Sequence, residues 1–354
     1  MVSIEEILGE AAKYNASDVH ITVGVPPKMR VNGALINMNY PVLTPETAEG
    51  IIGTILDKHH KAIYEEKGEV DFSISVPGIG RYRVNVFRQR GVMAAALRIV
   101  GTVIPRPEQL GVPKAVQDLH TRKRGLVLVT GPTGSGKSTT LASVINLINE
   151  DSTSHIITLE DPIEYMHTHK RAMINQREVG FDTQSYNNAL RAALREDPDV
   201  ILVGEMRDYE TISIAVTAAE TGHLVFSTLH TIGSAATIDR IIDVFPTNQQ
   251  AQIRVQLSMV LEAVISQQLL PTADQKRRVA AFEVMISNPA IKNLIREGKT
   301  HQIQSMIQTN RKIGMQTMDD ALYDLYRRGE ITGQTCASYA QDIVNMDKRL
   351  RGLA

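Results

Sequence analysis

The residues whose types and spacing carry the clearest chemistry form one glycine-rich segment, Gly131-Pro132-Thr133-Gly134-Ser135-Gly136-Lys137-Ser138. Every position fits the pattern G-x-x-x-x-G-K-[ST]. An apolar run, Leu126–Thr130, precedes the segment and a helical pattern over Lys137–Asn149 follows it, which is the context that a phosphate-binding loop requires. Glycines let backbone N–H groups surround phosphates, and a helix N-terminus adds a positive dipole end. The segment therefore predicts a nucleotide phosphate site rather than a merely flexible loop.

Individual residues of this loop have expected roles toward ATP and Mg²⁺. The Lys137 ammonium is expected to reach the β- and γ-phosphates, and the Ser138 hydroxyl is expected to hold Mg²⁺. The residues predicted to contact the nucleotide are Gly131, Pro132, Thr133, Gly134, Ser135, Gly136, Lys137, Ser138 and Thr139.

Two acidic clusters follow predicted strands, where ligands bind in open α/β sheets. Glu160, Asp161 and Glu164 come after Ile156–Leu159, and Glu205 comes after Val200–Val203. Such carboxylates can polarise a water molecule or complete a Mg²⁺ site. The alternative is that they cap the helices that follow. Because both clusters occur in a chain that also has a phosphate-binding loop, we favour the catalytic interpretation.

A third polar cluster surrounds the predicted strand Leu224–Thr228. His230 follows this strand and His223 precedes it. A histidine beside the nucleotide sheet can sense the γ-phosphate, so both are candidate site residues. The alternative for each is an ordinary structural hydrogen bond.

Length and composition limit the class of protein. A chain of 354 residues is long enough for two domains. The formal net charge of −1, with no Trp and six Phe, argues against direct nucleic-acid binding. The single cysteine, Cys336, excludes an internal disulfide and a thiolate zinc cluster within one chain.

The sequence predicts a cytoplasmic protein. Residues from Ser3 to Glu6 resemble a helix capping box rather than a signal peptide. No apolar run reaches the roughly 18 residues needed to cross a bilayer. Any membrane role is therefore expected to depend on a partner.

The first hundred residues have a mixed α and β pattern. On the predicted strand Arg81–Arg88, Arg81, Arg83 and Asn85 should share one face. Two neighbouring arginines suggest an anion contact, with a solvated strand face as the alternative. Other expected elements are helices at Ile4–Tyr14 and from Pro45 to about Glu66, strands at Val19–Val23 and Asp71–Val76, and short β segments around Lys28–Leu35.

Prolines 105, 107 and 113 make residues 101–113 a predicted linker. After it, short apolar runs alternate with helical patterns, which is typical of parallel strands covered by helices on both faces. The helices are expected at Lys137–Asn149, Tyr186–Arg195 and Tyr209–Glu220. The last hundred residues are expected to be mainly helical, including Gln249–Gln268 and Thr317–Arg328.

Together these motifs resemble those of the secretion and pilus ATPases. Thr158–Glu164 resembles their Asp box, Asp199–Asp208 their atypical Walker B motif, and Thr221–Thr231 their His box. The segment Ala290–Glu297 is similar to the C-terminal signature of the type IV pilus retraction ATPases, which act in twitching motility, with Lys292 in place of the usual arginine. Extension and secretion relatives usually carry an extra N-terminal domain and a four-cysteine zinc motif, which this sequence lacks.

The resemblance implies a fold and an assembly. It implies an α/β chain with a small α+β, PAS-like N-terminal domain over residues 1–100 and a RecA-like P-loop ATPase domain over 114–354, joined by the linker 101–113. It also implies a homohexamer that hydrolyses ATP to retract pili. This ring would lie in the cytoplasm, peripheral at the inner membrane, and turn a PilC-like platform protein.

The resemblance also implies roles for site residues. Glu164 is expected to be the general base, with Glu160 as the alternative, and Glu205 the carboxylate on the Mg²⁺ side. Arg81, Arg83 and Arg98 are expected to reach the phosphates from the N-terminal domain.

Three other functions stay open at this point. A pilus-extension or type II secretion ATPase would use the same chemistry. A RecA-like nucleic-acid translocase would share the fold, and a non-catalytic scaffold would bind ATP without releasing phosphate.

Overall fold

The computed structural model describes residues 2–31, 33–101 and 103–352. Its contacts divide the chain into two compact units, Met1–Val103 with Pro162–Met166, and Ile104–Asp161 with His167–Ala354. The boundary after residue 103 falls inside the predicted linker 101–113, of which residue 102 lies outside the described part.

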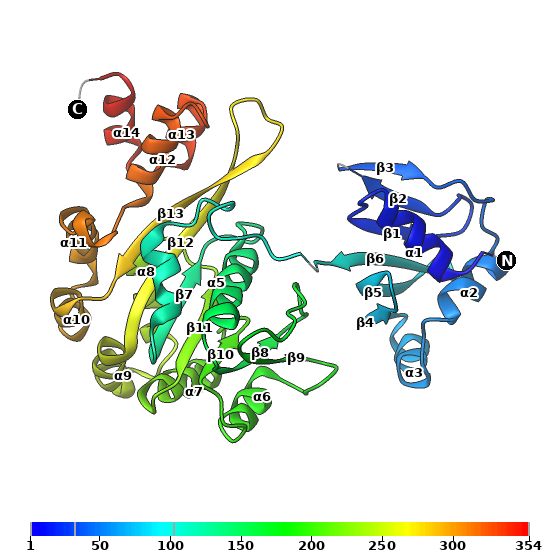
Figure 1. The fold of residues 1–354 in the computed structure, drawn as a ribbon, viewed down its shortest axis with the longest axis horizontal. Helices are drawn as coiled ribbons and strands as arrows, with labels where there is room; N and C mark the ends of the chain where they lie inside the picture. The colour runs from blue at the N-terminus through cyan, green and yellow to red at the C-terminus, as the bar shows by residue number, and fades with distance from the viewer. Residues whose placement is uncertain (1, 32, 102, 353–354) are drawn as a thin grey trace. The chain divides into compact units, whose positions relative to one another are not determined.

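The first unit is built on a six-stranded antiparallel sheet with strand order β3-β2-β1-β6-β5-β4 (Figure 1). The strands are β1 (Asp18–Ile21), β2 (Lys28–Val31), β3 (Ala34–Asn37), β4 (Glu69–Val76), β5 (Gly80–Gln89) and β6 (Val92–Val100). The helices are α1 (Ile4–Lys13), α2 (Pro45–Gly53) and α3 (Lys58–Lys67). This composition confirms the mixed α and β pattern predicted for the first hundred residues.

Helix starts in this unit follow the capping chemistry of the sequence. The predicted capping box is present, since Ser3 Oγ accepts from Glu6 N at 3.2 Å and Ser3 N donates to Glu6 Oε2 at 2.9 Å. The single helix predicted over Pro45–Glu66 is wrong, because the segment forms two helices. Asp57 Oδ1 accepts from His60 N at 2.8 Å and thereby starts a second helix.

The predicted alternation along β5 is confirmed. Tyr82, Val84 and Val86 are fully buried, whereas Arg83 is exposed and Arg81 is half-buried. The burial of one face fixes the register of the strand, because a slip by one residue would place the arginines in the core.

The second unit contains a seven-stranded sheet with strand order β13-β12-β7-β11-β10-β8-β9. Its strands are β7 (Gly125–Thr130), β8 (His155–Glu160), β9 (Met173–Glu178), β10 (Val200–Val203), β11 (Leu224–Leu229), β12 (Leu261–Pro271) and β13 (Arg278–Ile286). Strands β7, β11, β10 and β8 pair in parallel, which confirms the predicted parallel sheet. The carboxyl ends of these strands therefore share one edge of the sheet.

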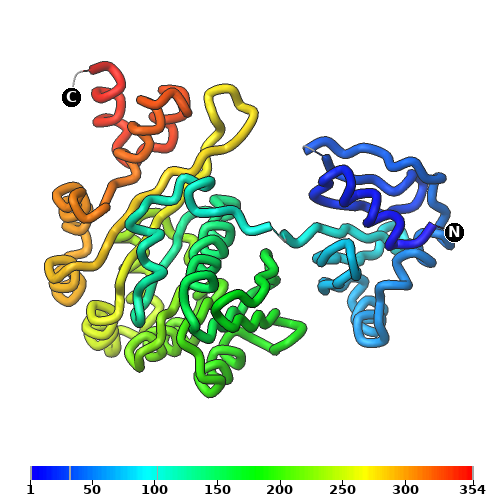
Figure 2. The backbone as a smooth tube through the Cα atoms, viewed as in Figure 1, coloured from blue at the N-terminus to red at the C-terminus, as the bar shows by residue number. Residues whose placement is uncertain are grey.

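Helices cover this sheet, and further helices form the end of the chain (Figures 1 and 2). Helix α7 has the bounds that its pattern predicted, and α5 and α6 differ from prediction only at their C-terminal ends. The helices are α4 (Lys114–Gln117), α5 (Lys137–Asp151), α6 (Tyr186–Ala193), α7 (Tyr209–Glu220), α8 (Ser234–Asp243), α9 (Thr247–Val260), α10 (Pro289–Arg296), α11 (Ile303–Thr309), α12 (Met318–Arg327), α13 (Gly333–Tyr339) and α14 (Ile343–Leu350).

The helix predicted over Gln249–Gln268 is wrong in its second half. Helix α9 ends at Val260, and the chain continues as strand β12. β12 pairs with β7 on one side and β13 on the other, and Ala263, Val264 and Ile265 are fully buried. A strand buried on both faces gives a continuous apolar run that periodicity cannot distinguish from a buried helix. The expectation of a mainly helical final hundred residues misses the β12–β13 hairpin for the same reason.

The C-terminal helices have their own small core on this hairpin. Leu270 of β12 and Ala281 of β13 pack with Met318 and Leu322 of α12. The Cys336 thiol belongs to the same core and donates to Met346 Sδ at 3.3 Å, and burial raises the pKa of Cys336 to about 11. Across the described residues, no helix is long and apolar enough to span a membrane.

Candidate nucleotide-binding site

The phosphate-binding loop lies between β7 and α5, as the sequence predicts. Gly131, Gly134 and Gly136 have φ values of 138°, 78° and 90°, which side chains rarely allow. Gly136 precedes the 15-residue helix α5 and gives it no side-chain cap. A helix N-terminus presents backbone N–H groups and a positive dipole end that favour an anion. Lys137 Nζ donates to the carbonyl oxygens of Gly131 and Pro132 at 2.9 and 3.0 Å, which holds the ammonium over the loop.

A residue that sequence reasoning missed, Gln267 of β12, supports this loop. Its side chain is 3% exposed, and its Oε1 accepts from Thr140 Oγ1 of α5 at 2.8 Å. A Cβ atom on Gly131 would lie 2.2 Å from the Gln267 backbone oxygen, and one on Gly136 would lie 2.9 Å from Gln267 Nε2. Packing against the backbone of β12 therefore requires glycine at position 131 as well as phosphate binding does, whereas at position 136 the contact is with the movable end of a side chain. No local signal reveals this contact, because residues 136 and 267 are far apart in the sequence.

Glu205, the second of the predicted acidic groups, lies at the carboxyl edge of the same sheet and is connected to the phosphate-binding loop through His230. Its Oε2 forms an ion pair with Arg207, at 2.8 Å from Nε, and lies 3.3 Å from His230 Nε2. The other ring nitrogen of His230, Nδ1, lies 3.5 Å from Thr133 Oγ1 in the phosphate-binding loop. His230 thus bridges Glu205 and the loop, which brings together three of the predicted site residues.

Glu160 and Glu205 lie at the ends of adjacent strands. Gly204 N donates to Leu159 O at 2.7 Å, and a Cβ atom on Gly204 would lie 2.7 Å from the hydroxyl of Tyr186. Burial, together with the charges of nearby carboxylates including Glu160 and Glu205, raises the pKa of Tyr186 well above its ordinary value. Tyr186 is a second residue that the sequence did not reveal, and it places a neutral phenol beside the acidic groups.

The two candidates for the general base have different surroundings. Glu160 Oε1 accepts from Thr158 Oγ1 at 2.7 Å and from Gln176 Nε2 at 3.2 Å, so strand neighbours hold this carboxylate. Glu164 is exposed and belongs to Pro162–Met166, the segment grouped with the first unit. There Gly101 N donates to Glu164 O at 3.1 Å.

The assignment of His223 to the phosphate site does not hold within one chain. His223 precedes β11, which is parallel to β7 with Leu224 beside Gly125 and Leu229 beside Thr130. Six residues of strand, at about 3.3 Å each, separate this edge of the sheet from the phosphate-binding loop. His223 Nδ1 instead lies 2.9 Å from Ala218 O, which is the structural alternative.

The three predicted arginines all belong to the first unit. Arg98 of β6 lies directly opposite Arg83 of β5, so the two share a face of that sheet with Arg81. Arg98 Nε donates to Asp18 Oδ1 at 2.8 Å, and Arg83 Nε lies 3.9 Å from Asp71 Oδ1. They form a cationic face, and their reach to a nucleotide stays a prediction.

The donors present fit ATP with Mg²⁺. The buried hydroxyl Ser135 Oγ has no hydrogen-bond partner among the described residues, as expected of a group that faces a ligand. No group of three or more His, Cys, Asp or Glu side chains among the described residues is arranged to hold a metal ion by itself.

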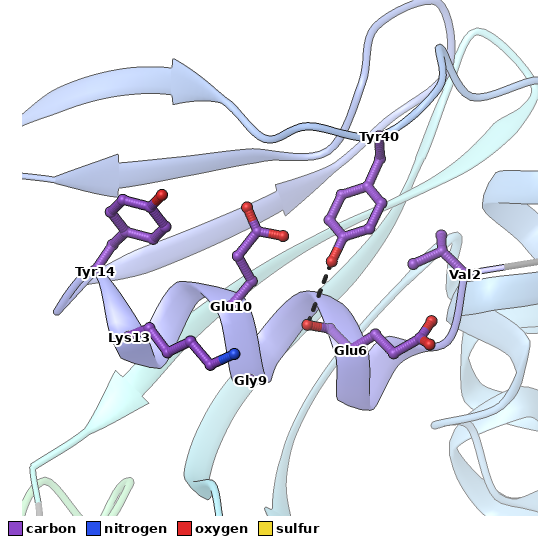
Figure 3. A pocket seen from close by; sticks show the side chains of 7 residues that line it. All are labelled: Val2, Glu6, Gly9, Glu10, Lys13, Tyr14 and Tyr40. Atoms are coloured by element: carbon purple, nitrogen blue, oxygen red, sulfur yellow. Dashed lines mark hydrogen bonds between the residues drawn. The ribbon is translucent and has the colours of Figure 1, made fainter.

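A separate hollow lies on the first unit, along α1 (Figure 3). It measures about 810 Å³ and contains Glu6, Glu10 and Lys13. Figure 3 shows Glu10 between Tyr14 and Tyr40, and burial beside Glu10 raises the pKa of Tyr40 to about 12. Two carboxylates and a single lysine give this hollow no means of binding a triphosphate.

Comparison with known proteins agrees with the nucleotide-binding site inferred from the phosphate-binding loop and the parallel sheet. The family model described as type II/IV secretion system protein matches residues 1–341. A twitching motility protein of Neisseria gonorrhoeae is 50% identical over 320 residues, covering 90% of this chain and 86% of that protein. The type IV pilus retraction ATPase PilT of Pseudomonas aeruginosa is 48% identical over 340 residues, covering 96% of this chain and 98% of that protein.

A solved structure extends this similarity to three dimensions. The crystal structure of the pilus retraction motor PilT with bound ADP is 51% identical, with a TM-score of 0.93, and the match covers 98% of this chain and 100% of that one. The predicted α/β fold and the resemblance to secretion and pilus ATPases are thereby confirmed. The chain belongs to the type II/IV secretion system protein family.

Proposed function

We propose that this protein is an ATPase whose hydrolysis of ATP powers the retraction of type IV pili. The observation that carries the proposal is the phosphate-binding loop, in which Lys137 and an uncapped helix N-terminus converge beside Glu205 and His230. Relatives named as pilus retraction ATPases share half of the sequence over nearly the whole chain. These two kinds of support are independent, since one concerns chemistry and the other concerns ancestry.

Different residues of the chain bind the phosphates, hold Mg²⁺ and respond to the γ-phosphate. Backbone N–H groups of residues 131–139 and the Lys137 ammonium bind the β- and γ-phosphates. Ser138 and Glu205 would hold Mg²⁺, which supplies positive charge for the leaving and transferred phosphoryl groups. His230 orients Glu205 and contacts Thr133, so it is placed to respond to the γ-phosphate.

Glu164 is the better candidate for the general base. A base must accept a proton from a water molecule, which requires a carboxylate that water can reach. Glu164 is exposed, whereas Glu160 is held by Thr158 and Gln176. Glu164→Gln should keep nucleotide affinity while reducing phosphate release at least about a hundredfold, and unchanged hydrolysis would remove Glu164 from this role.

Cations from the first unit complete the proposed mechanism. Arg81, Arg83 and Arg98 supply positive charge to the phosphates when the units close, within one subunit or between subunits of a homohexamer. An arginine in this role is worth roughly 10³–10⁵ in rate, or about 4–7 kcal/mol of barrier. Turnover should therefore rise with protein concentration as rings form, and full activity in a demonstrated monomer would refute the ring.

The motor acts in the cytoplasm on an inner-membrane platform protein of the PilC kind. The biological test is a deletion strain complemented with the parent gene or with Lys137→Ala. Retraction predicts excess surface pili and no twitching in the deletion strain, restored by the parent gene alone. A strain without pili would instead indicate an extension ATPase. Strongly salt-dependent stimulation of turnover by DNA would indicate a nucleic-acid translocase.

A further inference from the structure

A buried carboxylate outside the proposed catalytic groups, Glu283 of β13, lies beneath the loop that carries His230. Glu283 is 0% exposed. Its Oε1 accepts from the backbone N and the hydroxyl of Ser234 at 2.7 and 2.8 Å. Ser234 is the first residue of α8, whose N-cap, Gly233, offers no side chain, so Glu283 caps this helix from a distant strand.

The neighbouring strand holds the same loop. Ser266 of β12 lies directly opposite Glu283, and its hydroxyl accepts from Gly233 N at 3.0 Å. Two cross-strand neighbours thus fix the last residue of the loop and the first residue of the helix. Only residues 231–232 separate this clamp, formed at Gly233 and Ser234, from His230, which contacts both Glu205 and Thr133.

The other oxygen of Glu283 faces the end of the chain. Glu283 Oε2 accepts from Gln341 Nε2 at 3.3 Å. Gln341 lies between α13 and α14, and its backbone N donates at 2.7 Å to Asp319 Oδ1 of α12. One carboxylate therefore contacts the C-terminal helices through one oxygen and the His230 loop through the other.

We propose that Glu283 is a positioning residue for His230, and that Gln341 couples the C-terminal helices to it. The inference rests on the proposed ATPase function, because His230 acts there through Glu205 and Thr133. A shift of the Gln341 turn changes the hydrogen bonds on Glu283, and the Ser234 clamp passes that change to the loop. The C-terminal helices thereby set how well His230 holds Glu205, without contacting the nucleotide.

Three variants separate the two contacts of Glu283. Glu283→Ala removes both. In Glu283→Gln the amide oxygen can still accept from Ser234. The amide NH₂ group then faces the NH₂ group of Gln341, and two donors cannot bond, so only the contact with Gln341 is broken. Gln341→Ala breaks that same contact from an exposed position, where folding is not at risk. Gln334→Ala, at another exposed position on α13, is the matched control.

The test measures kcat and KM for MgATP, with thermal unfolding alongside. We expect kcat to fall about three- to tenfold in Glu283→Gln and Gln341→Ala, and by more than about tenfold in Glu283→Ala. KM should change less than about twofold, because the phosphate-binding loop is untouched. The double variant Glu283→Gln with Gln341→Ala should equal either single variant, since both break one contact.

Several results would overturn the inference. The first is a kcat in Gln341→Ala equal to that of the parent. The second is a double variant in which the two losses of kcat multiply. The third is a loss of kcat in Glu283→Gln or Gln341→Ala no larger than that in the control Gln334→Ala. If the parent chain itself releases no phosphate above the Lys137→Ala background, the proposed ATPase function fails. If the parent is active and Gln341→Ala matches it, only the role of Glu283 fails.

Discussion

The glycines of the phosphate-binding loop differ in what surrounds them, and this difference predicts unequal effects of alanine. Gly131 and Gly134 both have positive φ, at 138° and 78°. A Cβ atom on Gly131 would lie 2.2 Å from the backbone oxygen of Gln267, whereas one on Gly134 meets nothing within 4 Å. Gly131→Ala therefore adds a steric clash with β12 to the backbone strain that both variants share.

The magnitude follows from these two contributions. Backbone strain at positive φ costs about 1–2 kcal/mol for an alanine, and forcing an atom into a packed site costs about 1–3 kcal/mol more. Gly134→Ala should lose about 1–2 kcal/mol of unfolding free energy, and Gly131→Ala about 2–5 kcal/mol. The clash cannot be relieved by a rotamer change, because the neighbouring atom belongs to the backbone of β12.

The assay is urea unfolding without nucleotide, followed by far-ultraviolet circular dichroism because the chain has no Trp. Measuring both variants without nucleotide removes any effect of the added methyl group on phosphate binding. Equal losses in the two variants would show that Gln267 does not brace the loop, and the packing argument would be refuted.

Two further predictions concern pH. Burial, and to a smaller extent the charge of Lys170, lowers the pKa of His167 to about 4. Between pH 6.5 and 4 only the unfolded chain therefore binds this proton, and the free energy of unfolding should fall by about 3 kcal/mol across that window. His167→Gln should flatten the dependence of the urea-unfolding free energy on pH. Burial alone would raise the pKa of Asp320, but hydrogen bonds from Thr317 and Arg311 hold it below its ordinary value. The stabilisation is therefore fully present above the ordinary pKa of an aspartate and is lost progressively as the pH falls through the lower folded-state pKa. Asp320→Asn should cost about 1–3 kcal/mol at pH 7, and the difference from the parent should narrow as the pH falls below about 4. An unchanged pH profile in either variant would contradict the corresponding assignment.

Local patterns were sufficient to predict much of the second unit. The strand before Gly131 and the helix from Lys137 follow from apolar runs, glycines and periodicity, all of which are local. Glu160 and Glu205 lie at one edge of the sheet as expected, because parallel strands align their carboxyl ends.

What the sequence did not reveal depends on contacts between distant segments. The sequence predicts a helix through Gln268, into β12, because the pairing of β12 with β7 and β13 leaves no periodic signature. Gln267 and Tyr186 reach the site from elements that no motif marks. His223 precedes β11, and because β11 is parallel to β7 this order alone places it at the edge of the sheet opposite the phosphate-binding loop.

The most direct measurement of the central claim is calorimetric titration of the purified chain with a non-hydrolysable ATP analogue and Mg²⁺. We expect one site per chain that saturates below millimolar analogue. Binding should be lost in Lys137→Ala, because the ammonium that this substitution removes lies over the loop, bonded to the carbonyl oxygens of Gly131 and Pro132. The Glu164→Gln variant should bind as the parent does. No heat of binding at millimolar analogue, in a chain shown to be folded, would contradict the account.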